Sequence, residues 1–205
     1  MAEVREYKEN SCAVFHRTRD EYGAFSNMAS GFSYRVGDVE MLSSEHHYQA
    51  SRFPENPEIQ RMILGTRSPI MAKRKAYEFI AKTRKDWTEV NIRIMRHCIQ
   101  LRYAFNRPRL SGLYEQSGDQ PIVEKSMRDD FWGAKPTGSG MLRGINALGR
   151  LHMGHRQDIK LSPELFSHIV AAPDVDRYRI MGEDIGVTQI PEGHASPGWQ
   201  AGFDL

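Results

Sequence analysis

The chain has 205 residues and a mass of 23.5 kDa, the size of one domain or of one domain with an appendage. Hydrophobic residues make up 40% and charged residues 26% of the chain. These globular values exclude disorder, collagen and coiled coil as descriptions of the whole chain. The net charge of +2 does not by itself indicate a nucleic-acid partner.

Two cysteines, Cys12 and Cys98, are too few for a secreted disulfide framework, and no CxxC pair suggests a zinc ribbon. The first ten residues are polar and charged, without the apolar core of a signal peptide. Nothing in the sequence approaches the ~18 consecutive apolar residues that a membrane span needs. We therefore expect a soluble, cytoplasmic protein without a membrane partner. The oligomeric state is left open.

Short apolar runs near the N-terminus predict strands. One run covers residues 12–15, and two more cover residues 32–36 and 39–42. Gly37 and Asp38 separate the last two runs and form a typical hairpin turn. We expect the first 42 residues to form a small antiparallel sheet.

From Ser43 onward, apolar residues recur at three- and four-residue spacings, which predicts helices. Capping residues and prolines mark where these helices begin, and glycines or prolines mark where they end. The predicted helices are one from Ser43 to before Pro54, one from Pro57 to Gly65, one from Pro69, the longest over 88–105, a short one near Pro108 and a last one from Asn146. Their expected core residues are Ile59, Met62, Ile63, Ala72, Ala76, Phe79, Ile80, Val90, Ile94, Cys98, Leu101, Leu110, Leu113, Leu148, Leu151 and Met153.

Two other stretches complete the predicted fold. Residues 122–123 suit one more strand, and four glycines within residues 133–144 predict a flexible or phosphate-approaching loop. The predicted fold class is α+β, mainly α: a helical domain with a small N-terminal antiparallel sheet. We expect this domain to cover residues 12–158, and residues 159–205, where proline, glycine and acidic residues alternate with short apolar pieces, to form a C-terminal appendage.

The densest group of polar residues follows Ser43. On a helix, Glu45, Tyr48, Gln49 and Arg52 share one face because their offsets are three, four and seven residues. One interpretation is a solvated helix face whose glutamate simply lies in the first turn. The alternative is the wall of an active site, in which Glu45 acts as a base or nucleophile.

Three further groups carry side chains suited to binding. Residues 124–133 combine carboxylates with Trp132 and Gly133, which offer a ring for stacking and bare backbone for a close approach. Asp86 precedes Trp87, and residues 25–27 form a polar turn. The alternatives are structural: an anchored loop, a helix-start anchor and ordinary turn chemistry.

Sequence motifs for other chemistries are absent. His152 and His155 have helical spacing but lack the carboxylate of an HExxH zinc motif. Neither a P-loop nor a GxSxG motif occurs, so NTPase and α/β-hydrolase chemistry have no support. We expect no metal and no cofactor.

Taken in order, these groups resemble the motifs of the NADAR (YbiA-like) family over about residues 14–157. Each motif alone is weak, but five in the right order and spacing are specific. The matching residues are Phe25-Ser26-Asn27, then Ser44, Glu45, His46, Tyr48, Gln49 and Ala50, then Asp86-Trp87, then Glu124, Ser126, Asp129, Trp132 and Gly133, and finally Asn146, Leu148, Gly149, Met153 and Arg156.

The resemblance implies a mostly helical fold with a small sheet and cleavage of an N-glycosidic bond of ribose. Two substrate classes are associated with such proteins: ADP-ribose attached to guanine in DNA or RNA, and ribosylamino-pyrimidine phosphates of riboflavin synthesis. We favour the first, because Arg52, Arg128 and Arg156 are candidates to hold a diphosphate. A non-catalytic module that binds ADP-ribose is a further alternative.

Carried over by position, the resemblance implies a catalytic set and a binding set. The catalytic set is Glu45, Trp87 and Asp129. The residues expected to bind substrate are Phe25, Ser26, Asn27, His46, Tyr48, Gln49, Arg52, Ser126, Arg128, Trp132, Gly133, Asn146 and Arg156. The family usually has lysine where this chain has Arg52, and an arginine stays protonated, so it cannot act as an amine nucleophile.

Overall fold

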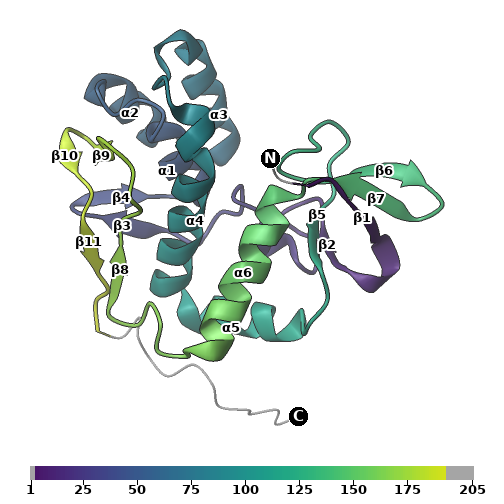
Figure 1. Ribbon diagram of the computed structural model, residues 1–205. Coiled ribbons are helices and arrows are strands. Elements are labelled where there is room, and N and C mark those ends of the chain that lie inside the picture. The colour runs from purple at the N-terminus through teal and green to yellow at the C-terminus, as the bar shows by residue number, and fades with distance from the viewer. Residues whose placement is uncertain (1–2, 193–205) are drawn as a thin grey trace.

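The computed structural model describes residues 3–192, and within them six α-helices pack with several small sheets (Figure 1). The α+β class predicted from the sequence is confirmed. The helices are α1 (Ser44–Ala50), α2 (Pro57–Leu64), α3 (Pro69–Glu78), α4 (Trp87–Phe105), α5 (Arg107–Gln116) and α6 (Ala147–Leu161). None of the helices within residues 3–192 has the length and hydropathy of a membrane-spanning segment.

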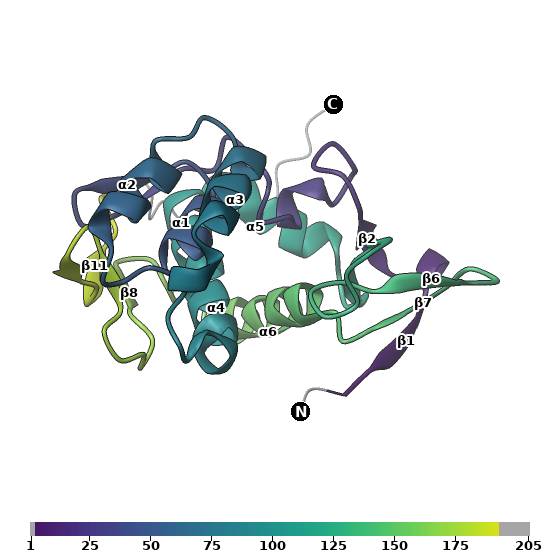
Figure 2. The same ribbon diagram turned by 90° about the horizontal axis from the view of Figure 1, so that it is seen from above.

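Helix α1 is short, yet it lies at the centre of the helical part. Ser43 caps it: the Ser43 side chain accepts a hydrogen bond from the backbone N–H of His46 at 3.4 Å. Helices α2, α3 and α4 all contact α1 (Figures 1 and 2), and every residue of α1 is buried. A helix so enclosed positions its polar side chains rigidly, although it has only two turns.

The predicted helix positions are largely confirmed, with two corrections in the expected core. Met62 on α2 and Ile80 after α3 are 42% and 47% exposed. Both lie outside the core cluster that contains Ile59, Ile63, Ala72 and Ala76. In contrast, all four core residues predicted on α4, namely Val90, Ile94, Cys98 and Leu101, are buried.

The strands pair differently from the prediction. The first 42 residues do not form one sheet, because their strands belong to three. β1 (Arg5–Lys8) pairs antiparallel with β7 (Met141–Gly144), which also pairs with β6 (Lys135–Gly138). β2 (Ala13–Phe15) pairs in parallel with β5 (Ile122–Glu124). Only β3 (Tyr34–Val36) and β4 (Val39–Met41) form the predicted hairpin. An apolar run specifies a strand but does not specify a distant partner.

The glycine-rich stretch 133–144 is a β-hairpin, not the predicted loop. Gly138 and Gly140 adopt positive φ values of 95° and 71° in its turn, which only glycine adopts easily. At the base of the hairpin, a Cβ on Gly144 would lie 2.4 Å from the carbonyl oxygen of Gly133. These glycines therefore serve a tight turn and close backbone packing rather than phosphate contact.

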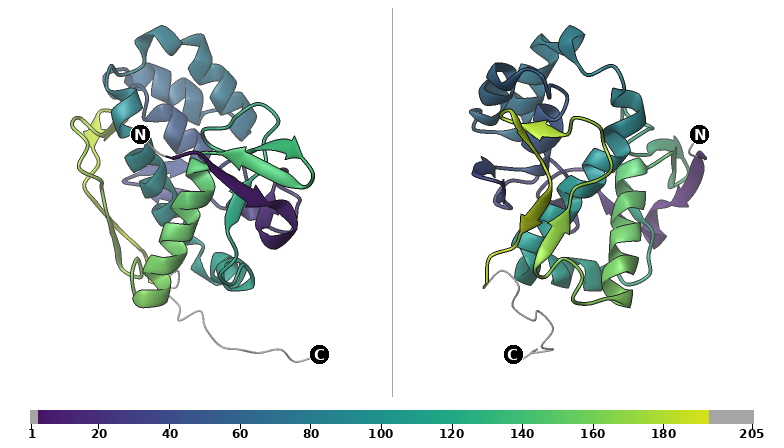
Figure 3. Two further views of the ribbon diagram at one scale, coloured as in Figure 1. Left: turned by 45° about the vertical axis from the view of Figure 1, so that its right-hand side comes forward. Right: turned by 60° about the vertical axis from the view of Figure 1, so that its left-hand side comes forward.

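The segment after α6 packs along the outer side of the helices (Figure 3). Its short strands are β8 (Ile169–Ala171), β9 (Arg179–Ile180), β10 (Glu183–Asp184) and β11 (Val187–Gln189). The expected boundary at 158/159 falls inside α6, and the proposed division into domain and appendage stays a prediction. Residues 193–205 of that appendage lie outside the described residues.

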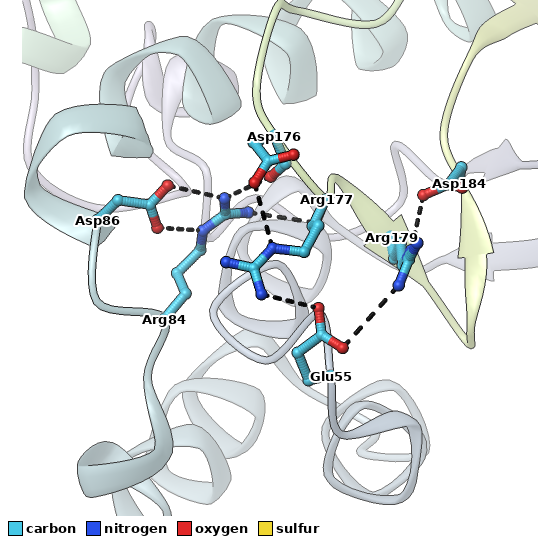
Figure 4. A network of polar contacts seen from close by, with 7 residues as sticks. All are labelled: Glu55, Arg84, Asp86, Asp176, Arg177, Arg179 and Asp184. Atoms are coloured by element: carbon cyan, nitrogen blue, oxygen red, sulfur yellow. Dashed lines mark hydrogen bonds and ion pairs between the residues drawn. The ribbon is translucent and has the colours of Figure 1, made fainter.

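A network of charged residues joins this segment to the chain just before α4 (Figure 4). Arg84 donates two hydrogen bonds to Asp86, at 2.7 and 2.9 Å, and a third to the backbone oxygen of Asp176 at 2.6 Å. Glu55 lies within 4.0 Å of Arg177 and Arg179. A bidentate arginine–carboxylate pair has a well-defined geometry. The pair therefore fixes the position of Asp86 and of Trp87, the first residue of α4.

Candidate active site

The carboxylate of Glu45 is the centre of the candidate site. Glu45 is 2% exposed, and its two oxygens each accept a hydrogen bond from an amide: one from Asn27 and one from Gln49 Nε2 at 2.7 Å. The backbone N–H of Glu45 also donates to the carbonyl oxygen of Asn27 at 3.1 Å. The predicted polar turn 25–27 therefore docks on the first turn of α1.

The predicted polar face of α1 is a single hydrogen-bonded row. Gln49 accepts a hydrogen bond from Arg52 Nε at 2.7 Å, so Gln49 links Glu45 to Arg52. Glu45, Gln49 and Arg52 are all buried. The interpretation of this face as a solvated surface is therefore wrong.

Aromatic rings enclose the Arg52 guanidinium. Its central carbon lies 4.4 Å from the ring centroid of Trp87 and 5.8 Å from that of Tyr48. Tyr48 in turn contacts Trp87, with ring centroids 4.8 Å apart, and Trp132, at 5.6 Å. The rings of α1, α4 and the loop after β5 thus form one cluster, and cation–π attraction holds Arg52 within it.

The loop after β5 brings Asp129 and Trp132 to this cluster. One carboxylate oxygen of Asp129 accepts hydrogen bonds from the backbone N–H groups of Phe131 and Trp132, both at 2.9 Å. The Ser126 hydroxyl accepts from the N–H of Asp129 at 3.0 Å. Asp129 therefore shapes the loop through one oxygen, and no hydrogen bond within residues 3–192 involves the other oxygen.

A third carboxylate, Glu124, joins the site from the end of β5. The prediction from sequence included Glu124 in a motif but gave it no role. Its backbone N–H donates to Asn146 Oδ1 at 3.1 Å, and its carbonyl oxygen accepts from the Ala134 N–H at 2.8 Å. An acidic residue directly after the buried pair Ile122–Val123 was the available signal.

The charges of Asp129 and Glu45 both act on Glu124. Burial raises the pKa of Glu45, while hydrogen bonds from Gln49 and Asn27 and the charges of Lys73 and Arg52 oppose the rise. Burial also raises the pKa of Glu124 to about 7, with further contributions from the charges of Asp129 and Glu45. Glu124 is thus poised to hold a proton near neutral pH, as a general acid must.

Several predicted binding residues make structural contacts. Phe25 is fully buried, with its ring centroid 5.0 Å from Tyr114 and 4.8 Å from His152. The His46 ring bonds Ser43 Oγ at 2.8 Å and the Thr66 carbonyl oxygen at 3.1 Å.

The loop residues Ser26, Ser126 and Gly133 also serve the backbone. The Ser26 hydroxyl accepts from the Met28 N–H at 3.2 Å, and the Ser126 hydroxyl accepts from the N–H groups of Arg128 and Asp129. A Cβ on Gly133 would lie 2.5 Å from the carbonyl oxygen of Glu124. These contacts favour positioning roles over direct contact with a substrate.

Asn146 is a second positioning residue. It adopts a left-handed conformation, with φ 52°, directly before α6, a conformation that asparagine tolerates better than most residues. Its amide group is buried and donates to the Ile122 carbonyl oxygen at 2.8 Å, besides accepting from Glu124. Both ends of the amide are occupied by β5, so Asn146 holds Glu124 in place.

Arg156 lies away from Glu45, in the later turns of α6. Nine residues separate it from Ala147 at the start of α6, about 13 Å along the helix axis. Its guanidinium donates to Ser117 Oγ at 2.8 Å. It lines a cavity of about 450 Å³ with Tyr103, Tyr114 and other residues, none of them from α1. The structure therefore separates Arg156 from the other predicted phosphate-binding residues. Arg128 is exposed on the loop that carries Asp129.

The two histidines on α6, His152 and His155, are buried in the core. The His152 ring bonds the Tyr114 hydroxyl at 2.7 Å and the Phe25 carbonyl oxygen at 2.8 Å, and burial holds its pKa well below the usual range. The part of the chain that the structure describes contains no group of three or more His, Cys, Asp or Glu side chains placed to hold a metal ion.

Most of the chain matches a known protein family. The sequence model of the NADAR domain family matches residues 14–160. The chain belongs to the NADAR family. This confirms the resemblance drawn from the five motifs.

Three relatives are informative. N-glycosidase YbiA of Escherichia coli is 27% identical over 158 residues, which are 77% of this chain and 94% of that protein. An N-glycosidase of Nostoc punctiforme is 28% identical over 148 residues, 71% of this chain and 91% of that protein. A riboflavin biosynthesis protein of Vibrio vulnificus is 31% identical over 146 residues, 71% of this chain but only 38% of that protein's length.

The fold agrees with a solved relative. The NMR structure of E. coli YbiA superposes with a TM-score of 0.63 at 28% sequence identity and covers 76% of this chain and 88% of YbiA. The α+β architecture described above is therefore similar to that of YbiA.

Proposed function

We propose that this chain is an N-glycosidase that hydrolyses an N-ribosidic bond. The observation that carries the proposal is the buried Glu45 carboxylate, held by Asn27 and Gln49 beside two further carboxylates. Cleavage of a C–N glycosidic bond builds positive charge on the ribose, and carboxylates placed in advance stabilise that charge. Two relatives whose full length this chain nearly covers are named N-glycosidases.

The three carboxylates divide the chemistry. The C1′–N bond breaks and its electron pair moves to the base, which takes a proton from Glu124. Water attacks C1′ and gives its proton to the free oxygen of Asp129, while the charge of Glu45 stabilises the cationic sugar. Trp132 supplies a ring face for stacking, whereas Trp87 holds Arg52 beside the site. The proposed steps use no metal.

We favour ADP-ribose attached to guanine in nucleic acid as the substrate. Lys73 is exposed on α3, and its positive charge acts on both Glu45 and Glu124. A phosphate group of a substrate bound beside these carboxylates can pair with it. A ribosylamino-pyrimidine phosphate of riboflavin synthesis is the second candidate. It is favoured by the relative named as a riboflavin biosynthesis protein.

One assay separates these possibilities. The purified protein is given an oligonucleotide that carries ADP-ribosylated guanine, or a ribosylamino-pyrimidine phosphate, and released base and sugar are quantified. Faster turnover of the oligonucleotide supports the favoured substrate, whereas faster turnover of the pyrimidine supports the second. Binding of ADP-ribose without turnover of either compound would show a binding module.

The activity should depend on pH through Glu124. Because its pKa is raised to about 7, the protonated fraction falls as the pH rises through 7, and kcat should fall with it. Glu124→Gln should lower kcat by about 10²-fold and remove this limb of the profile. A pH profile of kcat for both proteins checks the prediction. An unchanged limb in the variant would assign the titration to another group.

Arg156→Ala should change KM by less than about twofold, because Arg156 binds Ser117 rather than the site. Loss of a charged hydrogen bond should instead destabilise the fold by about 2 kcal/mol. Thermal unfolding and steady-state kinetics measure both effects. A large rise in KM at unchanged stability would instead support the prediction that Arg156 binds a phosphate of the substrate.

Hydrolysis should survive EDTA, because the proposed steps use carboxylates alone. The measurement is turnover before and after dialysis against EDTA, then after addition of zinc or magnesium. Activity that disappears and returns with a metal would contradict the mechanism.

A further inference from the structure

Positive charge is concentrated in one segment beside the candidate site. Residues 61–85 contain eight lysines and arginines and a single acidic residue, Glu78, so they carry a net charge of +7. The whole chain carries only +2. The segment comprises the end of α2, all of α3 and the approach to α4, which lie together at the end of the molecule opposite α5 (Figure 1).

One face of α3 presents this charge with an aromatic ring. Ile70, Lys73, Arg74 and Tyr77 are spaced by three, four and seven residues, so they share a face. All four are exposed, Tyr77 by 51% and Ile70 by 58%, while Ala72 and Ala76 are buried on the opposite side. We call these four residues the α3 face.

The two cations of the α3 face form no salt bridge with any of the residues 3–192. Among residues 3–192, neither Lys73 nor Arg74 has an ion pair, whereas the nearby Lys75 and Arg84 are paired with Glu78 and Asp86. Exposed cations without an ion pair are available to phosphate groups without breaking a salt bridge.

The α3 face continues directly into the candidate site. The Arg52 guanidinium carbon lies between two rings, 5.7 Å from the Tyr77 centroid and 4.4 Å from the Trp87 centroid. Lys73 lies at the site-facing edge: its charge acts on Glu45 and Glu124, and its ammonium is 6.0 Å from the Tyr77 ring. A ligand that occupies the site would therefore extend onto α3.

We propose that the α3 face binds the strand of a single-stranded nucleic acid next to the base presented to the site, with Lys73 and Arg74 on its phosphates and Tyr77 stacked on a neighbouring base. Alternation of cations with an exposed ring is the recognition mode of single-stranded nucleic acids. A base inside a duplex cannot reach a buried carboxylate unless it is flipped out. The choice of modified base rests on the proposed function, whereas binding of the strand is tested separately.

The binding test uses an unmodified, fluorescently labelled DNA 12-mer and an RNA 12-mer of the same sequence. Anisotropy gives Kd at several salt concentrations for the wild type, Arg74→Glu and a matched control, Arg96→Glu. Arg96 is an exposed arginine on α4, and its charge acts on His155 rather than on the site. The control Arg96→Glu thus makes the same charge reversal outside the α3 face.

Wild type should bind both strands, with an affinity that falls steeply with salt. Arg74→Glu should raise Kd about tenfold and flatten the salt dependence, because a reversed charge removes one phosphate contact and adds repulsion. Arg96→Glu should behave like the wild type. Equal Kd values for the two variants, no binding at low salt, or tighter binding to anionic phospholipid vesicles than to the strands would overturn the proposal.

Catalysis gives a second readout. Arg74→Glu should raise KM for a modified oligonucleotide about tenfold and leave turnover of the corresponding modified nucleoside unchanged. Strand binding that depends on Arg74, without cleavage of any N-riboside, would support the strand-binding role of the α3 face and reject the proposed function. Cleavage of both substrates with no effect of Arg74→Glu would support the proposed function and reject the strand-binding role.

Discussion

Replacing Glu45 with glutamine should lower kcat by about 10³-fold while the protein stays folded. The substitution removes the negative charge that stabilises the cationic sugar, and removal of a single preorganised electrostatic contact costs this much in other enzymes. Glutamine keeps the length of the side chain and one acceptor oxygen. The Asn27 amide can turn over to accept from the new amide, so loss of stability should be small.

The matched control is Glu58→Gln. Glu58 and Glu45 both lie in the first turn of a helix, where the helix dipole stabilises a negative charge. Glu58 is exposed, whereas Glu45 is buried. The control therefore reproduces the loss of the dipole interaction without touching the site. Turnover near the wild-type rate in Glu45→Gln, or an equal loss of activity in both variants, would show that Glu45 takes no part in the reaction.

Local signals in the sequence predicted the helices well because several helices begin at a capping serine or a proline. Ser43 and Ser68 accept hydrogen bonds from the N–H groups of His46 and Met71, as helix caps do. Pro57 and Pro69 occupy the first turns of α2 and α3. These effects act within four residues, so they can be read from a short window of sequence.

Pairing of strands could not be predicted in the same way. β2 pairs with β5, which lies more than 100 residues later, and β1 pairs with β7. Three- and four-residue strands carry too few side chains to specify a distant partner. Glycines were equally ambiguous: Gly133 and Gly144 suited a ligand loop, but close approach of protein backbone requires them.

The candidate site was predictable where several of its members lie on one helix. Glu45, Tyr48, Gln49 and Arg52 follow helical spacing, so their common face was visible in the sequence. Their burial was not visible, because it depends on α2, α3 and α4 packing around α1. Arg156 shows the limit of a motif match: the motif predicts it in the site, whereas in the structure it lines a cavity to which α1 contributes no residue.

Asp129→Asn should lower kcat by about 10²-fold and leave both ligand affinity and thermal stability near wild type. Asparagine keeps an acceptor oxygen for the N–H groups of Phe131 and Trp132, so the loop retains its shape. The substitution removes the charge that accepts a proton from water and attracts the cationic sugar. Because that charge repels a phosphorylated ground state, ADP-ribose should bind as tightly as before or more tightly.

Two further variants separate the charge of Asp129 from its hydrogen bonds. Asp129→Ala removes both, so it should lower kcat, weaken binding and reduce the melting temperature together. Trp132→Ala removes a stacking ring and should mainly raise KM, by a factor that corresponds to ~1–3 kcal/mol. The decisive comparison is Asn against Ala at position 129. If Asp129→Asn turns over at the wild-type rate and only Asp129→Ala is impaired, the carboxylate supports the loop, and water must be activated by Glu45 or Glu124 instead.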